Sequence, residues 1–413
     1  MDERKSRINP KHAQTPNSRK AKQVEDNFRL NSPQKRIKTK STSTDKSKSS
    51  RQGSSSTPLS SLILKSSTPK HSKVKKSNHR RFFSIDDRPT SSSNPKSSNP
   101  RTNLRKFSLD PNMLLPVVSK YNYLSNTGYI PGNTAKTNQD SYFAHINFAN
   151  QQDAYLFGVC DGHGFYGGEV SSFIKQRLPQ IIASDTEIHS NPKKALIRSI
   201  HKCNDELGKI NLDVKFSGST LNLVLIQGRT LYCANVGDSR SVLARQVLDP
   251  MDKSSSLNKW MAIAISRDHK PDHPEESKRI YASGGRVQAY QDENGNPAGP
   301  ARVWVKNQDL PGLAMSRSMG DAVAASVGVI CEAEVASLKL QPEDKFITIG
   351  SDGVFEFINN EEIVKLVVPY FRVGDCEGCC EAIVKESTRR WKTEEEVIDD
   401  ITALCVFLDI PSN

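Results

Sequence analysis

Aspartates stand at the ends of several apolar segments, where side chains from neighbouring strands can meet. They are Asp140, Asp161, Asp238, Asp352 and the adjacent pair Asp399 and Asp400. Carboxylates gathered in one place repel one another and acquire raised pKa values unless a cation offsets their charge. A set of oxygen ligands suits Mg²⁺ or Mn²⁺ better than Zn²⁺, so the pattern indicates a site for hard divalent cations. A single Asp-Gly pair is usually only a turn, and the repetition at strand ends favours the metal interpretation.

The segment after Asp161 also carries glycines at the spacing of a dinucleotide-binding loop. Gly162, Gly164 and Gly167 follow an apolar run and precede a helical one, as in that fingerprint. However, Asp161 would place negative charge where a pyrophosphate needs positive surroundings. No second strand ending in an acidic residue follows at the usual spacing either. We therefore prefer a site in which any bound anion arrives together with metal ions.

The elements that must position these residues are strands in adjacent pairs and helices in pairs. Strands are expected at 141–148, 154–160, 219–226, 230–235, 241–245, 259–266, 345–350 and 401–408, and helices at 168–182, 192–211, 274–282, 360–368 and 376–391. Asp238 is expected in a tight hairpin between two of these strands. In Leu221–Ile226 both alternating sets of side chains are apolar, so both faces should be covered. The order predicts stacked antiparallel sheets with helices outside them.

Charge divides the 413 residues into a basic arm and a mildly acidic body. The net charge is +12, but residues 1–110 contain 27 Lys and Arg against 8 Asp and Glu, whereas the remainder contains 31 against 38. The arm is rich in Ser, Lys, Asn, Thr and Pro. It cannot bury enough apolar surface to offset its ordering entropy. We predict a disordered arm at 1–112 and a folded domain at 113–410.

Two similar six-residue motifs occur in the arm, at Arg81–Asp86 and Arg105–Asp110. Each places an arginine three residues before a serine, Ser84 or Ser108, with an apolar residue and Asp after it. They are either chance repeats of a solvated tail or sites that protein kinases modify. The basic arm also leaves open a contact with nucleic acid or an acidic surface, which steep salt dependence would reveal.

Several classes of protein are not expected. The sequence has no run of 18 or more apolar residues, so no transmembrane segment is predicted. Neither a secretory signal nor the glycine needed for myristoylation follows Met1. The 8 cysteines are too sparse for a disulfide scaffold, and we expect a cytoplasmic or nuclear protein. Cys376, Cys379 and Cys380 lack a second Cys/His pair at usable spacing, which argues against zinc.

Together the motifs resemble those of the type 2C protein phosphatases, the metal-dependent Ser/Thr phosphatase family. They occur in family order over about residues 120–410, and the matching stretches are Thr137–Asp140, Val159–Gly164, Ser217–Thr220, Ala234–Arg240, Asp268–Pro271, Gly284–Val287, Pro311–Asp321, Ser351–Phe355 and Asp399–Thr402. The resemblance implies an α+β fold, a four-layer α/β/β/α sandwich of two antiparallel sheets flanked by helix pairs. It also implies two Mn²⁺ or Mg²⁺ ions in a cleft at one end. The implied reaction is hydrolysis of phosphoserine and phosphothreonine in phosphoprotein substrates by a metal-activated water.

The same resemblance implies the metal ligands. Asp161 would bridge both metals, and the carbonyl of Gly162 would bind one of them. Asp352 and Asp399 would hold the other metal. Asp399 matches the family ligand better than its neighbour Asp400.

The resemblance also implies roles for three further residues. Asp140 would orient the attacking water, and Asp238 matches a position that contributes to a weaker third metal site. His163 would be the general acid that protonates the departing Ser or Thr oxygen. From the sequence alone, the alternative is that His163 is only a histidine of a turn.

The chain departs from familiar family members at a few positions. Where a phosphate-binding arginine is expected, position 135 is Ala, and Lys136 is the nearest cation. Gln139 replaces an acidic residue before Asp140. A lysine binds phosphate as a point charge but lacks the fork of arginine. An alternative function therefore stays open, a weakly active or non-catalytic phosphoprotein-binding scaffold on the same fold.

The variable flap of the family is expected at Tyr290–Val305. Its segment Gln291–Pro297 is rich in turn-forming residues and predicts a surface loop. The loop is either a spacer or an element that helps to choose phosphoprotein substrates.

Overall fold

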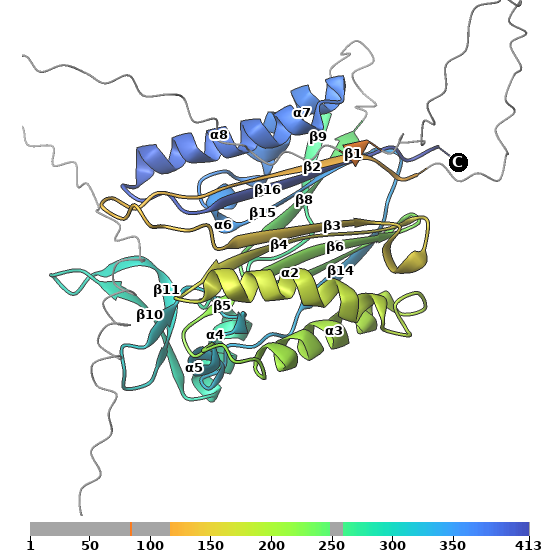
Figure 1. The fold of residues 1–413 in the computed structure, drawn as a ribbon. Helices are drawn as coiled ribbons and strands as arrows, with labels where there is room; N and C mark the ends of the chain where they lie inside the picture. The colour runs from red at the N-terminus through yellow and green to blue at the C-terminus, as the bar shows by residue number, and fades with distance from the viewer. Residues whose placement is uncertain (1–82, 85–115, 248–258, 413) are drawn as a thin grey trace, which may run out of the picture. The chain divides into compact units, whose positions relative to one another are not determined.

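Two antiparallel β-sheets pack face to face, and each carries a pair of helices on its outer side (Figure 1). These four layers confirm the predicted α/β/β/α sandwich. The computed structural model describes residues 83–84, 116–247 and 259–412, and all of them belong to one compact unit. Most of the predicted arm at 1–112, including Ser108, lies outside the described residues.

The first sheet presents Asp140 and Asp161 at one end. Its strands run in the order β13, β5, β4, β6, β7, β14, and β3 pairs with β4. The bounds are β3 Asp140–Ile146, β4 Ala154–His163, β5 Gly218–Ser219, β6 Leu221–Gln227, β7 Thr230–Val236, β13 Met319–Gly320 and β14 Glu334–Lys339. The four predicted strands of this sheet are confirmed. The sequence analysis missed β14, because this edge strand is largely exposed and has no apolar run.

The second sheet presents Asp352 and Asp399 at the same end of the sandwich. Its strands run in the order β1, β2, β16, β15, β8, β9. The bounds are β1 Phe83–Ser84, β2 Val118–Asn126, β8 Arg240–Val247, β9 Lys259–Ala264, β15 Asp344–Gly350 and β16 Ile401–Leu408. The backbone of Ser84 pairs with that of Lys120 on β2. One of the two serines singled out in the arm therefore lies in a short edge strand.

Four long helices cover the outer faces of the sheets. Helices α2 (Gly167–Ala183) and α3 (Pro192–Leu207) lie on the first sheet, and α7 (Asn360–Val373) and α8 (Cys376–Glu394) lie on the second. None of the helices in the described residues is long and apolar enough to cross a membrane. The shorter helices are η1 Phe148–Asn150, α4 Pro274–Ala282, α5 Ala322–Ala325 and α6 Asp352–Phe355.

Local capping explains where two of these helices begin and end. At the start of α3, the side chain of Asn191 accepts a hydrogen bond from the backbone N–H of Lys194 at 3.3 Å, and Pro192 occupies the first turn. Helix α7 was predicted to end at Val368, but it continues through Pro369 to Val373 and ends at Gly374, which has a φ of 70°. The predicted end was wrong because apolar packing outweighs the hydrogen bond that a proline removes.

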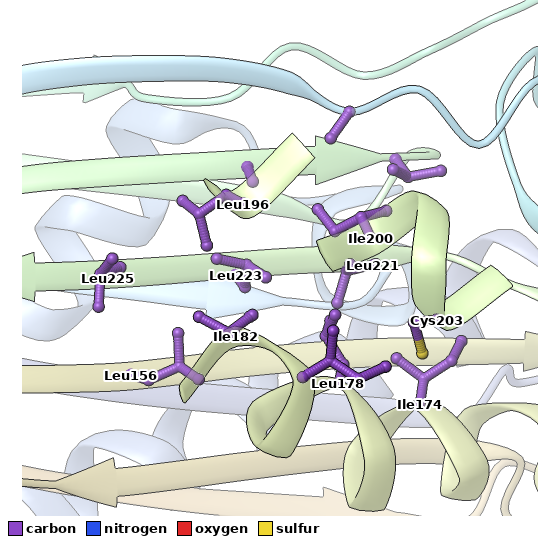
Figure 2. Close-up of a cluster of buried hydrophobic side chains, with 14 of the residues drawn as sticks. Leu156, Ile174, Leu178, Ile182, Leu196, Ile200, Cys203, Leu221, Leu223 and Leu225 are labelled. Carbon is purple, nitrogen blue, oxygen red and sulfur yellow. The ribbon is translucent and has the colours of Figure 1, made fainter. Parts of the chain in front are cut away.

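Strand β6 is buried on both faces, as its composition predicted. Leu221, Leu223 and Leu225 pack against side chains of α2 and α3 (Figure 2). Val224 and Ile226 point the other way, into the core between the two sheets. Because both faces are covered, β6 is a rigid centre from which the strands on either side are positioned.

The three cysteines near the C-terminus lie in the core between α8 and the second sheet. Cys376, Cys379 and Cys380 are buried there among apolar side chains. The Sγ atom of Cys379 is 3.2 Å from that of Cys405 on β16. The thiols thus pack as small hydrophobic groups do.

The expected flap loop is a small sheet of its own. Strands β10 (Gly285–Gln291), β11 (Pro297–Val305) and β12 (Pro311–Leu313) pair in this order. The predicted surface loop at Gln291–Pro297 corresponds to the exposed turn at 292–296, and only its two end residues belong to β10 and β11. These strands are stabilised by cross-strand pairs, which composition alone does not reveal.

Asp238 does not lie in a hairpin of one sheet. Strands β7 and β8, on either side of it, belong to different sheets, so its turn carries the chain across the sandwich. Gly237 adopts a φ of 99° here. Its backbone N–H donates to Nδ1 of His269 at 3.1 Å, and its carbonyl accepts from the N–H of His269 at 3.0 Å. This distant partner, rather than a β-ladder, holds the turn.

Candidate active site

The two sheets bring four carboxylates to one end of the sandwich. Asp140 and Asp161 are opposite each other in the β3–β4 pair. Asp352 lies two residues after the end of β15, Asp399 lies two residues before the start of β16, and these two strands pair with each other. The hydroxyl of Ser351 connects the sheets by donating to Oδ2 of Asp140 at 2.9 Å. The sites predicted at separate strand ends therefore lie at a single place in the fold.

Each of these carboxylates has a raised pKa. Withdrawal from water raises the pKa of Asp140 to about 7, and the charges of Asp400 and Asp399 add to the effect although hydroxyl hydrogen bonds oppose it. Burial, and then the charges of Asp140 and Asp352, raise the pKa of Asp161 well above its usual range. Burial followed by the charge of Asp399 does the same for the pKa of Asp352. The cluster thus holds more negative charge than the protein offsets, a condition that bound cations relieve.

The donor atoms of the cluster fit hard divalent cations. Oδ1 of Asp140, Oδ1 of Asp238 and Oδ1 of Asp352 are buried and have no hydrogen-bond partner among the described residues. Gly162 can carry no side chain beside them, since a Cβ would lie 2.2 Å from the carbonyl oxygen of Gly167. In this part of the chain, no three His, Cys, Asp or Glu side chains are already arranged to hold a metal ion. The donors are nonetheless all oxygen atoms, which Mg²⁺ and Mn²⁺ prefer.

His163 stands beside the cluster with one ring nitrogen held by a carboxylate. Its Nε2 is 2.6 Å from Oδ2 of Asp321, and that same oxygen accepts from the hydroxyl of Ser318 at 2.6 Å. Burial alone would lower the pKa of His163, but the charge and hydrogen bond of Asp321 raise it above its usual value of 6.5. Nδ1 has no partner in the described part of the chain. Asp321 thus orients the ring and favours its protonated form.

The model of the family described as "Protein phosphatase 2C" matches residues 132–395. The chain belongs to this family. A probable protein phosphatase 2C 35 from Arabidopsis thaliana is 35% identical over 307 residues, which cover 71% of this chain and 85% of the relative. A probable protein phosphatase 2C 64 from Oryza sativa subsp. japonica is 34% identical, covering 66% of this chain and 62% of that protein.

Solved structures share the fold. A serine-threonine phosphatase 2C from Toxoplasma gondii superposes with a TM-score of 0.59 at 19% identity, covering 71% of this chain and 97% of that one. A C. elegans sex-determining protein gives a TM-score of 0.55 at 16% identity, with 71% and 65% covered. The chain is therefore a protein phosphatase 2C enzyme, a class of metal-dependent hydrolases, with the sandwich of that family.

One departure from the protein phosphatase 2C pattern has a clear structural consequence. Lys136, the nearest cation to the position of the expected arginine, places its Nζ 2.6 Å from Oδ1 of Asp400. The carboxylate of Asp400 also accepts the backbone N–H groups of Gly128 at 2.7 Å and Gln139 at 2.9 Å. Lys136 thus takes part in a group of contacts to Asp400 that hold the segment before β3 against the residues just before β16.

The neighbouring aspartates Asp399 and Asp400 differ sharply in their surroundings. Asp400 is 4% exposed and is bound by three donors. Asp399 is half-buried, and within the described residues its Oδ1 accepts the backbone N–H of the adjacent Asp400 at 2.7 Å. The geometry therefore leaves Asp399, and not Asp400, available to a metal in the protein phosphatase 2C site.

Two residues of the site received no role from the sequence. Asp321 holds His163, and Lys270 places its Nζ 2.5 Å from Oδ2 of Asp238. Burial alone would lower the pKa of Lys270, but Asp238 raises it. Both residues lie inside stretches that resemble family motifs. Their motif membership was the available signal, but only the fold shows which side chains they contact.

Proposed function

We propose that this phosphatase hydrolyses phosphoserine and phosphothreonine in proteins by attack of a water molecule, with two Mn²⁺ or Mg²⁺ ions at the carboxylate cluster. The observation that carries the proposal is the set of half-buried carboxylates from both sheets, whose raised pKa values and unpartnered oxygens suit bound cations. A purely structural cluster would be expected to pair these charges within the protein.

In this proposal Asp161 and the carbonyl of Gly162 hold the metals from the first sheet, and Asp352 and Asp399 hold them from the second. Asp238 supports a weaker third ion. When bound, the cations supply Lewis-acid chemistry that lowers the pKa of water and offsets the charge of the phosphoryl oxygens. Lys270 already neutralises one oxygen of Asp238, which is consistent with weaker binding at the third position.

The protein's own residues orient water and move a proton. Asp140, with a pKa raised to about 7, accepts a hydrogen bond from the attacking water through its unpartnered Oδ1. His163 donates a proton from Nδ1 to the departing Ser or Thr oxygen, while Asp321 holds its Nε2. A proton donor at this position contributes typically 10²–10⁴-fold to a rate.

A direct assay tests the proposal. Phosphate release from a phosphothreonine peptide is measured with Mn²⁺, with excess chelator, and for Asp161→Asn with Mn²⁺. We expect release by the native chain only with the metal, and a loss of about 10³-fold or more in the variant, because several kcal/mol of charge stabilisation disappear. Full activity in excess chelator would overturn the metal mechanism.

The alternative, a phosphoprotein-binding scaffold, is favoured by the engagement of Lys136 with Asp400. It predicts that the native chain binds the phosphopeptide in the presence of Mn²⁺ but releases no phosphate. Measuring binding and release on the same sample separates the two functions.

For the arm, we infer that protein kinases modify Ser84 and Ser108, whose flanking arginines suit a phosphate. We also propose a cytoplasmic or nuclear location, where the 8 free cysteines stay reduced. Weak contact of the arm with nucleic acid or an acidic surface is the remaining proposal. Binding that does not change between low and high salt would reject it.

A further inference from the structure

The proposed reaction needs a protein cation that binds the substrate phosphate, and the expected position lacks one. Position 135 is alanine, and the Nζ of Lys136 is held by the buried carboxylate of Asp400 at 2.6 Å. Arginine is the side chain best suited to a phosphate, because its planar fork offers parallel N–H donors. A suitable arginine must therefore be sought elsewhere around the cluster.

Arg302 on strand β11 is buried in an unusual way. Only 8% of the residue is exposed, and its Nη1 donates to the carbonyl oxygen of Gly312 at 2.7 Å. Its guanidinium lies over the ring of Tyr290, 4.7 Å from the centroid. The Nε atom is buried and has no hydrogen-bond partner among the described residues. A buried donor of a charged group is rarely left without an acceptor, so this arrangement points to a ligand.

The local backbone is built to hold this arginine. Gly312 adopts a φ of 76°, and a Cβ there would lie 2.9 Å from the ring of Trp304. The glycine therefore lets its carbonyl approach the Nη1 side of the guanidinium. The same segment, Pro311–Asp321, continues to the aspartate that holds His163. Arg302 and the proposed proton donor are thus positioned by the two ends of one segment.

Arg302 lies within electrostatic range of Asp238 of the cluster. Burial lowers the pKa of Arg302, and the neighbouring acidic groups of Tyr290 and Asp238 oppose this effect. None of the ion pairs found in the described residues includes Arg302. Figure 1 shows the β10–β11 hairpin at the end of the sandwich where α2 begins, directly after the segment of His163. The hairpin that carries Arg302 therefore lies at the end of the sandwich that holds the cluster.

We propose that Arg302 binds the phosphate of the substrate, with the Nε edge of its guanidinium toward the phosphate oxygens and its Nη1 side held by Gly312. This inference rests on the proposed phosphatase function. In it the flap sheet supplies the phosphate-binding cation that position 135 lacks. The phosphate oxygens give the Nε–H its missing acceptor, and the phosphate adds the counter-charge that no carboxylate pair provides.

Arg286 in the same hairpin is a matched control. Its guanidinium also lies over an aromatic ring, 5.0 Å from the centroid of Trp304. However, it is paired with Asp309 at 2.5 Å and donates to the side chain of Gln288 at 2.9 Å. The two arginines thus share strand pairing, charge and ring contact, but only Arg302 is buried with a donor that lacks a partner.

The experiment compares the native full-length chain with Arg302→Met, Arg302→Lys and Arg286→Met, all with saturating Mn²⁺. Steady-state kinetics use p-nitrophenyl phosphate, which has no peptide to contact the flap. Calorimetry measures the Kd of inorganic phosphate independently of turnover. For Arg302→Met we expect KM and this Kd to rise about 10- to 100-fold, the cost of one hydrogen-bonded charge pair, while kcat changes less. Arg302→Lys should recover part of the affinity, and Arg286→Met should stay within about twofold of the native chain.

The outcomes separate this inference from the function on which it rests. A native chain that binds phosphate but releases none would reject the proposed function, and the Kd comparison would still test Arg302. Equal phosphate affinity for the native chain and a folded Arg302→Met would overturn the inference. If Arg302→Met does not fold, Arg302→Lys, which keeps the charge but has no Nε–H donor, takes its place in the comparison. A phosphate Kd for folded Arg302→Lys equal to that of the native chain would then equally reject the inference.

Discussion

The fold treats the buried carboxylate of Glu276 and the half-buried carboxylate cluster in opposite ways. Around Glu276 on α4, which is 0% exposed, Arg279, Arg317 and Ser316 donate hydrogen bonds at 2.7, 2.6 and 2.6 Å. Although burial alone would raise it, these donors hold the pKa of Glu276 well below its usual range. At the carboxylate cluster the pKa values are raised and several oxygens lack partners. The fold thus pairs the carboxylate that serves structure and leaves unpaired those that face a ligand.

The adjacent residues Asp400 and Asp399 show the same contrast between a paired and an unpaired carboxylate. Asp400→Ala should cost about 3–5 kcal/mol of unfolding free energy, because it leaves Lys136 and two backbone N–H groups without their buried partner. Asp399→Ala should leave the stability of the metal-free protein within about 1 kcal/mol, yet lower phosphate release about 10³-fold. Urea unfolding with chelator and an activity assay with Mn²⁺ measure both effects. A larger loss of stability for Asp399→Ala would reverse the assignment of the two aspartates.

The carboxylate of Asp321 lies between a fully paired carboxylate and one left free for a ligand, because its partner is the proposed proton donor His163. His163→Gln should lower kcat about 10²-fold by removing the proposed proton donor. Asp321→Asn should lower kcat less and also lower the pKa of His163, because only the charge of Asp238 then opposes the effect of burial. The pH above which kcat declines should therefore move down in Asp321→Asn, as a pH profile between 5 and 9 would show. An unchanged profile would remove Asp321 from this role.

The two acidic groups should also respond oppositely to pH in the absence of metal. Asp140 has an ordinary pKa of 3.8 and a pKa of about 7 in the fold, so its contribution to stability is lost as pH rises through this range. Glu276, whose pKa is lowered from 4.5, contributes stability above that pH and loses it in acid. The Tm measured with chelator should thus be highest near pH 5 and a few degrees lower at pH 8. Added Mn²⁺ should remove the decline at pH 8, and a Tm that rises steadily to pH 8 with chelator would contradict the origin assigned to it.

The smallest expected effect concerns the basic arm and the uncompensated charge of the cluster. Residues 1–110 carry 27 basic and 8 acidic residues, and a tethered group of opposite charge meets the site at high effective concentration. A chain starting at Asp110 should differ from the full-length chain in KM for a small phosphate ester by about fivefold or less, and only at low salt. Equal KM values for the two chains at low salt would show that the arm does not affect turnover and leave it only a role in binding an acidic partner.

Much of the fold could be predicted from local pattern. The run Leu221–Ile226 has apolar residues on both faces, and it forms the doubly covered centre of the first sheet. Helix α4 has the predicted bounds Pro274–Ala282, because a proline start and local periodicity define them. By contrast, β10 and β11 were missed around their turn-forming segment, since their stability comes from cross-strand pairs and from arginines stacked on Tyr290 and Trp304.

The sequence by itself determined the kind of chemistry. Oxygen donors at strand ends indicate hard cations whatever the order of the strands, because ligand preference is a property of the side chain. Only the tertiary structure decided which donors are available. Asp399 and Asp400 are chemically identical, and their difference arises from Lys136 and Gly128, more than 250 positions away in the chain. Whether a buried polar atom finds a partner depends on residues brought together by folding. The carboxylate of Asp400 is therefore bound by protein donors, whereas the Nε–H of Arg302 has no acceptor among the described residues.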